Sequence, residues 1–387
     1  MDEEAYVLLL STSKINLERR YILKSSKKIV ICVLLILISI ISLILINKNT
    51  NKTFNYKGGT IALIVDGNSA TSFPKSGKYN VTVNCNNAKG GWNPKTWKLE
   101  ITKITGTVTC DVSFNSSVTN LTTQVNNKAT RNENGKRYQG KNPDNYIWFN
   151  DELWRIIGNI PVCLTSGCST TESRVKIIRN DSIGAIAFNQ TNYSSSSPLT
   201  WMGSNIQNLL NTCYLGKTSS CDSYCYSYST SVKGTCDYSS DGIDTSDYYG
   251  KMVEDVYFNV GAGDSTDKTA ANYYTQEIAT HATSASKIGL MYASDWGYAM
   301  EGYTGVLGGG SGDPWNSSDK NWLFSNGNEW TMSAYSSSYP VNVSYSGGLN
   351  LISASVGFAA RPVLYLKSNV YVVSGTGTKV DPYRIGM

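Results

Sequence analysis

Residues 146–157 read YIWFNDELWRII, and this stretch decides the fold of the C-terminal part of the chain. Aromatic and β-branched residues fill both of its ends, and Asn150-Asp151-Glu152 separates them. Two such runs around a short polar turn are typical of an antiparallel hairpin. The stretch therefore predicts a β-sheet as the foundation of this region.

Further strands are predicted along the same region. One covers RVKIIR at 174–179, and a pair at 370–373 and 383–385 surrounds a glycine-containing turn. Everything after Ile288 has the composition of strands and glycine-rich loops. With strands in the majority, residues 136–387 are predicted as one strand-rich α+β domain.

Three short helices are predicted between these strands. The first follows Ser204, a typical N-cap, and carries apolar residues at helical spacing from Ile206 to Leu210. The second covers 246–257, where apolar residues again recur at helical spacing, and the third covers 270–281.

A second strand pattern lies nearer the N-terminus, in residues 58–114. Short alternating runs occur at 60–65, 79–83, 96–101 and 106–110. A segment of this size and pattern predicts a small β-sandwich, immunoglobulin-like in architecture, that serves as a spacer. Residues 115–135 are almost wholly polar and lack periodicity, so a linker is predicted there.

An uncharged apolar run from Ile29 to Ile46 predicts where the protein works. As a helix it would be about 27 Å long, close to the hydrocarbon thickness of a bilayer. Basic residues crowd the preceding tail, which predicts that residues 1–28 are cytoplasmic and that everything after a stalk at 47–57 is extracellular. A cleaved signal peptide is the alternative, but INKN at 46–49 lacks the small residues of a cleavage site.

The cysteines agree with this topology. Cys32 lies in the apolar run, and the other eight are Cys85, Cys110, Cys163, Cys168, Cys213, Cys221, Cys225 and Cys236. An even number in an oxidising compartment predicts up to four disulfides. Sequence proximity favours Cys85–Cys110 and Cys163–Cys168, with the remaining four paired among themselves. Zinc is the alternative for those four, but they contain no C-x-x-C spacing.

Composition limits the classes of partner. The chain is 16% charged with a net charge of +5, and its basic residues form no stripe, which excludes a nucleic-acid groove. The 26 tyrosines, together with abundant serine, asparagine and glycine, suit a recognition surface, because tyrosine offers a broad contact at low entropic cost. The same composition also suits an extracellular β-protein that merely avoids aggregation.

Three stretches of the large domain resemble known families. YIWFNDELWRIIG at 146–158 and ARPVLYLKS at 360–368 resemble the two ends of a surface domain of Gram-positive, gut-associated bacteria. GNEWT at 327–331 is similar to the Gly-Asn-x-Trp-Glu-Trp element of formylglycine-generating-enzyme-like proteins. The order of a serine run, a glycine pair and Arg-Pro-Val is similar to the tail of retroelement-diversified lectin-fold proteins. These resemblances imply a C-type-lectin-like fold and a membrane-anchored surface location.

The chain also departs from these families. Thr331 and Met332 follow Trp330 where the enzyme-like family continues Glu-Trp, and no cysteine lies beyond Cys236. The Glu-Pro-Asn and Trp-Asn-Asp tripeptides of calcium-dependent sugar-binding lectins are absent as well. The resemblance therefore implies a fold and a location, not an activity.

Aromatic residues near the C-terminus form the candidate recognition site. Trp322, Tyr335, Tyr339 and Tyr345 stand among serine, asparagine and glycine, and are predicted to contact ligand. Trp330 is expected in the core instead. The alternative is that the tyrosines alternate along strands and bury one face.

Catalytic candidates are weaker. His281 has no acidic neighbour in sequence, and the carboxylate pairs Asp151-Glu152 and Glu254-Asp255 lie in a turn and on a helix flank. Each is expected to be a solvated group rather than a catalytic one. Arg361 is expected to pair with a buried carboxylate.

One loop is a candidate metal site. Asp313, Asn316 and Asp319 follow a glycine-rich stretch that can fold around calcium, although such residues also stabilise ordinary turns. No other cofactor is expected. The sequence thus predicts a non-catalytic, membrane-anchored protein that recognises a glycan or a surface protein. A structural envelope or filament component is the first alternative, and a glycan-processing enzyme is the second.

Overall fold

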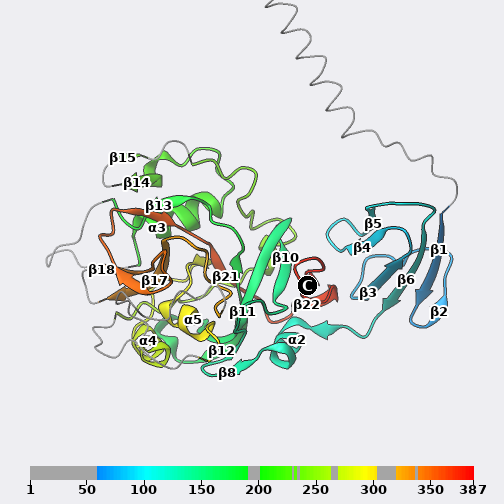
Figure 1. Ribbon diagram of the computed structural model, residues 1–387, viewed down its shortest axis with the longest axis horizontal. Helices are drawn as coiled ribbons and strands as arrows, with labels where there is room; N and C mark the ends of the chain where they lie inside the picture. Colours follow the sequence, from blue (N-terminus) through cyan, green and yellow to red (C-terminus); the bar gives the residue numbers. More distant parts are fainter. Residues whose placement is uncertain are drawn as a thin grey trace, which may run out of the picture. The chain divides into compact units, whose positions relative to one another are not determined.

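The computed structural model describes residues 59–190, 201–228, 231–232, 236–262, 269–302, 320–335 and 339–387. Residues from Gly59 onward form one compact unit that is rich in strands and carries several sheets and short helices, a mostly-β α+β arrangement (Figure 1). The predicted cytoplasmic tail, membrane helix and stalk at 1–28, 29–46 and 47–57 lie outside the described residues. Among the residues that are described, none of the helices has the length and apolar character needed to span a bilayer.

A four-stranded mixed sheet with the order β2-β1-β6-β3 begins the described chain. Its strands are β1 (Thr60–Val65), β2 (Asn68–Ser69), β3 (Asn80–Cys85) and β6 (Thr109–Asn115). β1 and β6 run parallel, whereas β3 and β6 run antiparallel. A separate hairpin pairs β4 (Lys89–Asn93) with β5 (Lys98–Thr102).

Both of these sheets contribute to one small aromatic core. Val81, Trp92 and Phe114 are buried in it, and the Trp92 and Phe114 rings meet edge to face at 4.8 Å. The Cys85–Cys110 disulfide joins facing residues of the neighbouring strands β3 and β6. The disulfide of an antibody domain joins its two sheets instead, so the small core departs from that pattern.

Residues 115–135 are not a linker. They contain β7 (Thr119–Asn120) and helix α2 (Leu121–Lys128), whose first turn is capped by the Asn120 side chain accepting from the Thr122 N–H. Leu121 and Val125, one helical turn apart, are fully buried in the large core. Because only these two residues anchor the helix, its polar composition hid it in the sequence.

The main sheet of the large region has the order β16-β21-β12-β11-β9-β8, with β10 added on β11. Its strands are β8 (Arg131–Asn132), β9 (Lys136–Arg137), β10 (Tyr146–Phe149), β11 (Glu152–Cys163), β12 (Thr171–Arg179), β16 (Ile288–Gly289) and β21 (Val363–Leu366). The predicted hairpin is confirmed as β10 and β11. Asn150 and Asp151 both have positive φ, 54° and 60°, as a two-residue hairpin turn that follows the twist of the strands requires.

Smaller sheets complete the large region. One has the order β13-β20-β17-β18-β19 and is built from β13 (Ala185–Ala187), β17 (Glu329–Tyr335), β18 (Tyr339–Val343), β19 (Leu349–Leu351) and β20 (Gly357–Ala359). A third sheet pairs β22 (Tyr371–Ser374) with β23 (Arg384–Gly386) on one side and β7 on the other, and β14 (Tyr226–Tyr228) pairs with β15 (Ser231–Val232). The strands predicted at 174–179, 370–373 and 383–385 are therefore confirmed.

The helix predictions had mixed outcomes. Helix α3 (Asn205–Asn208) follows Ser204, whose hydroxyl accepts from the Gln207 N–H as predicted. Helix α4 (Ala270–Glu277) is confirmed but ends before 281. The helix predicted at 246–257 is wrong beyond one short turn at Gly250–Met252. Helix α5 (Ala293–Tyr298) was not predicted.

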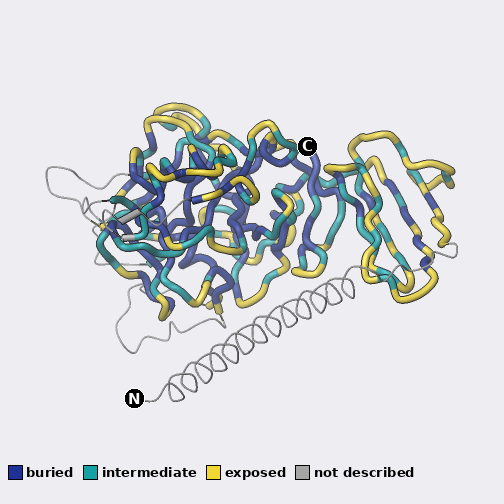
Figure 2. Tube along the Cα trace, turned by 90° about the horizontal axis from the view of Figure 1, so that it is seen from above, coloured by how far each residue is buried: buried dark blue, intermediate teal, exposed yellow. Residues whose placement is uncertain are grey.

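Strand β22 contributes to both cores. Tyr371 and Val373 pack into the small aromatic core, whereas Val370 and Val372 pack into the large one. Alternation along a strand sends successive side chains to opposite faces, so one strand can serve two cores. The small β-region, defined as residues 59–115, is therefore packed against β22. Figure 2 shows the burial of the chain along its length.

Candidate functional site

The predicted aromatic site lies on the hairpin of β17 and β18. Its base is buried: Trp330 is fully enclosed and its Nε1 donates to the Ile186 carbonyl at 2.7 Å. Beside it, Arg361 donates from Nε to Glu329 Oε1 at 2.6 Å, with both side chains buried. This confirms the expected pairing of Arg361 with a buried carboxylate and the expected core position of Trp330. Buried contacts therefore hold the base of this hairpin in place.

Exposure differs among the predicted contact tyrosines. Tyr339 is 49% exposed and Tyr345 is 72% exposed, while Tyr335 is half-buried against the large core. Tyr335 and Tyr339 face each other across the hairpin, so their side chains share one face of the sheet. Tyr345 lies two residues beyond the other end of β18, a strand about 13 Å long at the usual rise per residue. The structure therefore brings two of the three tyrosines together and holds the third apart.

Tyr345 lies on a turn that the protein holds in place. Its N–H donates to Asn328 Oδ1 at 2.9 Å, and the Ser344 N–H donates to the Gly348 carbonyl at 2.8 Å. The ring itself projects from a backbone that is anchored on both sides. Such a side chain loses little backbone entropy on binding a partner.

Trp322 is not a surface contact, and this prediction is corrected. The side chain is 5% exposed, and its Nε1 donates to the Tyr138 carbonyl at 3.0 Å. The guanidinium of Arg155 lies over the Trp322 ring, 4.5 Å from its centroid. Trp322 is therefore part of the core beneath the main sheet, and its polar neighbours in sequence gave no sign of this.

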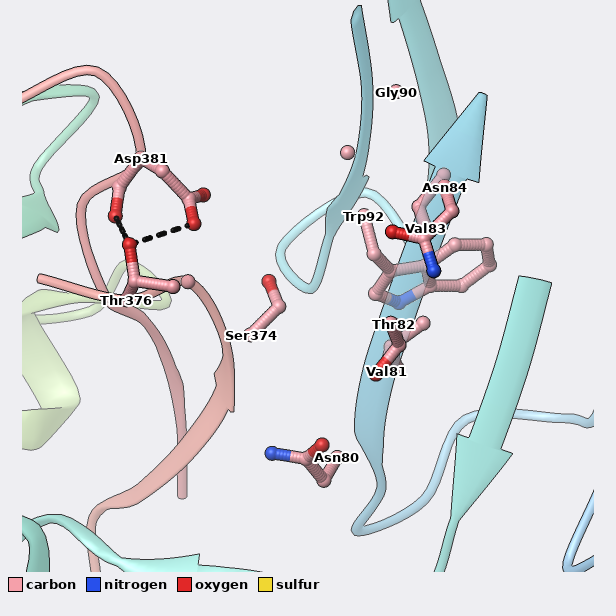
Figure 3. Close-up of a pocket in the computed structure, with 12 residues that line it drawn as sticks. Asn80, Val81, Thr82, Val83, Asn84, Gly90, Trp92, Ser374, Thr376 and Asp381 are labelled. Carbon is pink, nitrogen blue, oxygen red and sulfur yellow. Dashed lines mark hydrogen bonds between the residues drawn. The ribbon is translucent and has the colours of Figure 1, made fainter. Parts of the chain in front are cut away.

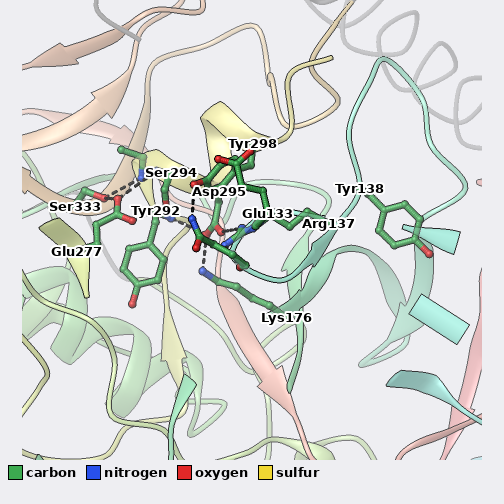
Figure 4. A network of polar contacts seen from close by, with 12 residues as sticks. Glu133, Arg137, Tyr138, Lys176, Glu277, Tyr292, Ser294, Asp295, Tyr298 and Ser333 are labelled. Carbon is green, nitrogen blue, oxygen red and sulfur yellow. Dashed lines mark hydrogen bonds and ion pairs between the residues drawn. The ribbon is translucent and has the colours of Figure 1, made fainter. Parts of the chain in front are cut away.

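A buried cluster of charges ties the main sheet to α5 (Figure 4). Asp295 accepts from Arg137 Nη1 at 2.7 Å and from Lys176 Nζ at 2.5 Å, and all three side chains are buried. Burial alone would raise the pKa of Asp295, but the two cations outweigh it and hold that pKa below its usual value. For Lys176, burial lowers the pKa in spite of Asp295.

Glu277 forms a neighbouring network with two serines. It accepts from the Ser294 hydroxyl and, at 2.5 Å, from the Ser333 hydroxyl, so it joins α4, α5 and β17. Burial raises the pKa of Glu277 to about 7, although the hydrogen bonds from the serines oppose the shift. The side chain is 2% exposed, so this group is placed to stabilise the fold. Neither network was predicted from the sequence. Lys176 lies inside a strand, where a lysine normally points to solvent, and the members of the Glu277 network come from separate segments of the chain.

The carboxylate pairs that were candidates for catalysis are engaged by basic residues. In the first pair, Asp151 contacts Lys95 at 2.6 Å and Glu152 contacts Arg179 at 2.6 Å. The second pair is occupied in the same way. Glu254 contacts Arg174 at 2.9 Å, and Asp255 contacts Lys287 at 2.5 Å. Among the described residues, the group of possible metal ligands around His281 contains neither pair.

His281 lies in a different setting from the one predicted. It follows the end of α4 and forms an isolated bridge with Asn259, and partial burial lowers its pKa. Its ring lies near Cys163 and Cys168, with possible ligand atoms of the three within 4.8 Å of one another. The two sulfurs are bonded to each other, so this group offers no thiolate to a metal.

All eight cysteines outside the apolar run form disulfides. The pairs are Cys85–Cys110, Cys163–Cys168, Cys213–Cys221 and Cys225–Cys236. The two pairs that sequence proximity favoured are among them, and the four cysteines considered for zinc are paired with one another. Four disulfides fit a domain in an oxidising, extracellular compartment.

The remaining predicted site is the calcium loop. Asp313, Asn316 and Asp319 lie outside the described residues. Comparison with known proteins adds no further guide, because no family model, no curated protein and no solved structure matches the chain.

Proposed function

We propose that this chain is a membrane-anchored cell-surface protein that binds a glycan or protein partner without catalysis. In this proposal residues 29–46 anchor it in the bilayer with the N-terminus cytoplasmic, and residues 136–387 form a C-type-lectin-like domain. The tyrosine hairpin makes the contact. It is defined as Tyr335, the last residue of β17, and Tyr339, the first residue of β18. Tyr345 provides a second contact point on the turn that follows β18.

One observation carries the proposal. Tyr339 is 49% exposed on a hairpin whose base is held by the buried Arg361–Glu329 pair and the enclosed Trp330. An exposed aromatic ring on a rigid support gives a large contact area at little entropic cost. The carboxylates considered for catalysis are already paired with basic residues, which favours binding over catalysis.

The test begins with an array of glycans and surface proteins, probed with the full chain in detergent, with calcium and with chelator. Replacing Tyr335 and Tyr339 together by alanine should abolish the signal for a specific partner and leave the melting temperature within a few degrees, because the Tyr339 ring and part of Tyr335 are solvent-exposed. Ile61→Ala is the matched control, since Ile61 is also 49% exposed but lies on β1. Unchanged binding by the double variant would refute the tyrosine hairpin as the contact.

The array also separates the alternatives. A signal that disappears with chelator would direct attention to the loop with Asp313, Asn316 and Asp319. A blank array combined with concentration-dependent assembly of the chain would favour a structural envelope or filament component instead.

A further inference from the structure

A polar cleft lies between strands β3 and β4 of the small β-region and the residues that connect β22 to β23. It has a volume of about 270 Å³ and is called the β3 cleft here (Figure 3). Its lining consists of Asn80, Val81, Thr82, Val83, Asn84, Gly90, Gly91, Trp92, Ser374, Gly375, Thr376 and Asp381. None of these residues belongs to the tyrosine hairpin, so the cleft is a separate place on the molecule.

One wall of the cleft is a strand edge. In the order β2-β1-β6-β3, strand β3 is the last, and it has a hydrogen-bonded neighbour only on the β6 side among the residues described. Five consecutive residues of β3 line the cleft, so both side chains and main-chain groups of that edge border it. Asn80, Thr82 and Asn84 alternate along the strand and therefore share a face.

The opposite wall adds hydroxyl groups and one carboxylate. Ser374 ends β22 and Thr376 follows it, and the Thr376 hydroxyl donates to Asp381 Oδ2 at 3.0 Å. No lysine or arginine is among the lining residues, and the one charged group of the lining is the Asp381 carboxylate. The cleft therefore offers amide and hydroxyl groups, which both donate and accept hydrogen bonds, with a single carboxylate acceptor.

Both walls are held in place. Cys85–Cys110 fixes β3 to β6, and Tyr371 and Val373 of β22 are packed in the small core. Lys89 bridges the walls by donating from Nζ to the carbonyl of Val380, next to Asp381. A preformed cleft keeps its polar groups in position before a ligand arrives, which lowers the cost of binding.

We propose that the β3 cleft binds a neutral saccharide unit through Asn80, Thr82, Asn84 and Asp381. Neighbouring hydroxyl groups of a sugar ring are donors and acceptors at once, which matches a lining of amides, hydroxyls and one carboxylate. The volume lies just below the range of roughly 300–1,000 Å³ for ligand pockets, so it suits a ligand about the size of one sugar ring. This site is independent of the tyrosine hairpin and gives the protein a second contact with a carbohydrate surface.

The experiment is saturation-transfer difference NMR on the full chain in a detergent whose head group carries no sugar. The probes are the methyl glycosides of glucose, galactose and N-acetylglucosamine, with glucose 6-phosphate and a five-residue extended peptide for comparison. At least one neutral glycoside should bind and saturate. The phosphorylated sugar should bind more weakly than the neutral glycosides, because the Asp381 carboxylate in the lining repels an anion.

Variants locate the binding. Asn84→Ala and Asp381→Asn should each weaken the glycoside about tenfold, the size expected for losing one or two hydrogen bonds to a buried ligand. Asp222→Asn is the matched control, an exposed carboxylate in the large region that lies outside the cleft, and should bind like the wild type. The variant with alanine at both Tyr335 and Tyr339 should also retain glycoside binding, which separates this site from the proposed recognition function.

Several outcomes would overturn the proposal. Wild-type affinity in both Asn84→Ala and Asp381→Asn would place any sugar binding elsewhere. Saturation by the peptide but by none of the glycosides would identify the edge of β3 as a site for strand addition. Absence of binding by every neutral glycoside would reject a saccharide as the ligand of this cleft.

Discussion

The two cores of this protein are built on different principles. The small core is closed by aromatic rings and one disulfide, and within residues 59–115 no charged side chain is buried. The large core encloses charged groups, including Arg137, Lys176, Glu277 and Asp295. A buried charge is costly without its partner, whereas an aromatic contact is indifferent to pH. The stability of the large region should therefore depend on protonation and on each ion pair, and that of the small region should not.

The strongest way to break this comparison is to neutralise one carboxylate in each region. Asp295→Asn leaves Lys176 and Arg137 buried without an anion, which should lower the free energy of unfolding by about 3–5 kcal/mol. Asp111→Asn makes the same chemical change on the exposed face of β6 and should cost less than about 0.5 kcal/mol. Urea denaturation followed by circular dichroism measures both. Equal losses would show that the buried Asp295 carboxylate contributes no more to the free energy of unfolding than an exposed one.

The disulfides sharpen the comparison further. Cys85–Cys110 closes a loop with a sequence separation of 25, and Cys163–Cys168 one of only 5. The chain-entropy argument gives a loss of about 3.5 kcal/mol for alanine at Cys85 and Cys110 but about 2 kcal/mol for alanine at Cys163 and Cys168. Urea denaturation of the two double variants tests this order. The reverse order would mean that the short loop supports the large core in the native state.

The pH dependence of stability is the third distinction. The pKa of Glu277 is raised from 4.5 in the unfolded chain to about 7 in the folded protein, so the folded state holds this proton more tightly. Its stabilising contribution is complete below pH 4.5 and is lost as the pH rises through 7, by up to about 3 kcal/mol.

The variant Glu277→Gln isolates this contribution. Its amide does not titrate, so the difference in unfolding free energy between wild type and variant should change across pH 4–8 in favour of the wild type at low pH. Denaturation at several pH values provides the measurement. A difference that stays constant over this interval would show that Glu277 is already ionised in the folded protein.

The sequence predicted correctly those features that residues close together in the chain determine. The hairpin around Asn150, the helix after Ser204 and the strand at 174–179 follow from turn residues, a capping hydroxyl and alternation. The disulfide pairs Cys85–Cys110 and Cys163–Cys168 follow from proximity in the chain. At the candidate site, a local argument paired Arg361 with a carboxylate, whereas the resemblance to the lectin fold placed Trp330 in the core.

The errors arose where distant segments decide the outcome. Val253 and Val256 have helical spacing, yet they are buried by bridges to Leu366 and Ser286 rather than by a helix face. Trp322 looked like an exposed aromatic because its neighbours are polar, but Tyr138 and Arg155 enclose it from another part of the chain.

The buried charges and the β3 cleft also could not be predicted from local sequence, because their members lie far apart in the chain. Lys176 has no charged partner near it in sequence, because Asp295 lies 119 positions away. The walls of the cleft come from β3, β4 and the stretch from Ser374 to Asp381, so no single stretch of sequence contains them. Such features become visible only when the chain is folded.

The shared strand β22 sets an order of events for the protein during its synthesis. Tyr371 donates to the carbonyl of Gly77 across 294 positions, and with Val373 it completes a core whose other members are made early. A ribosome delivers the first sheet long before its last packing partner, and contacts of such long range form slowly. Until the final strands emerge, the small core therefore lacks Tyr371 and Val373 and the large core lacks Val370 and Val372. A chain truncated before β22 would leave both cores incomplete.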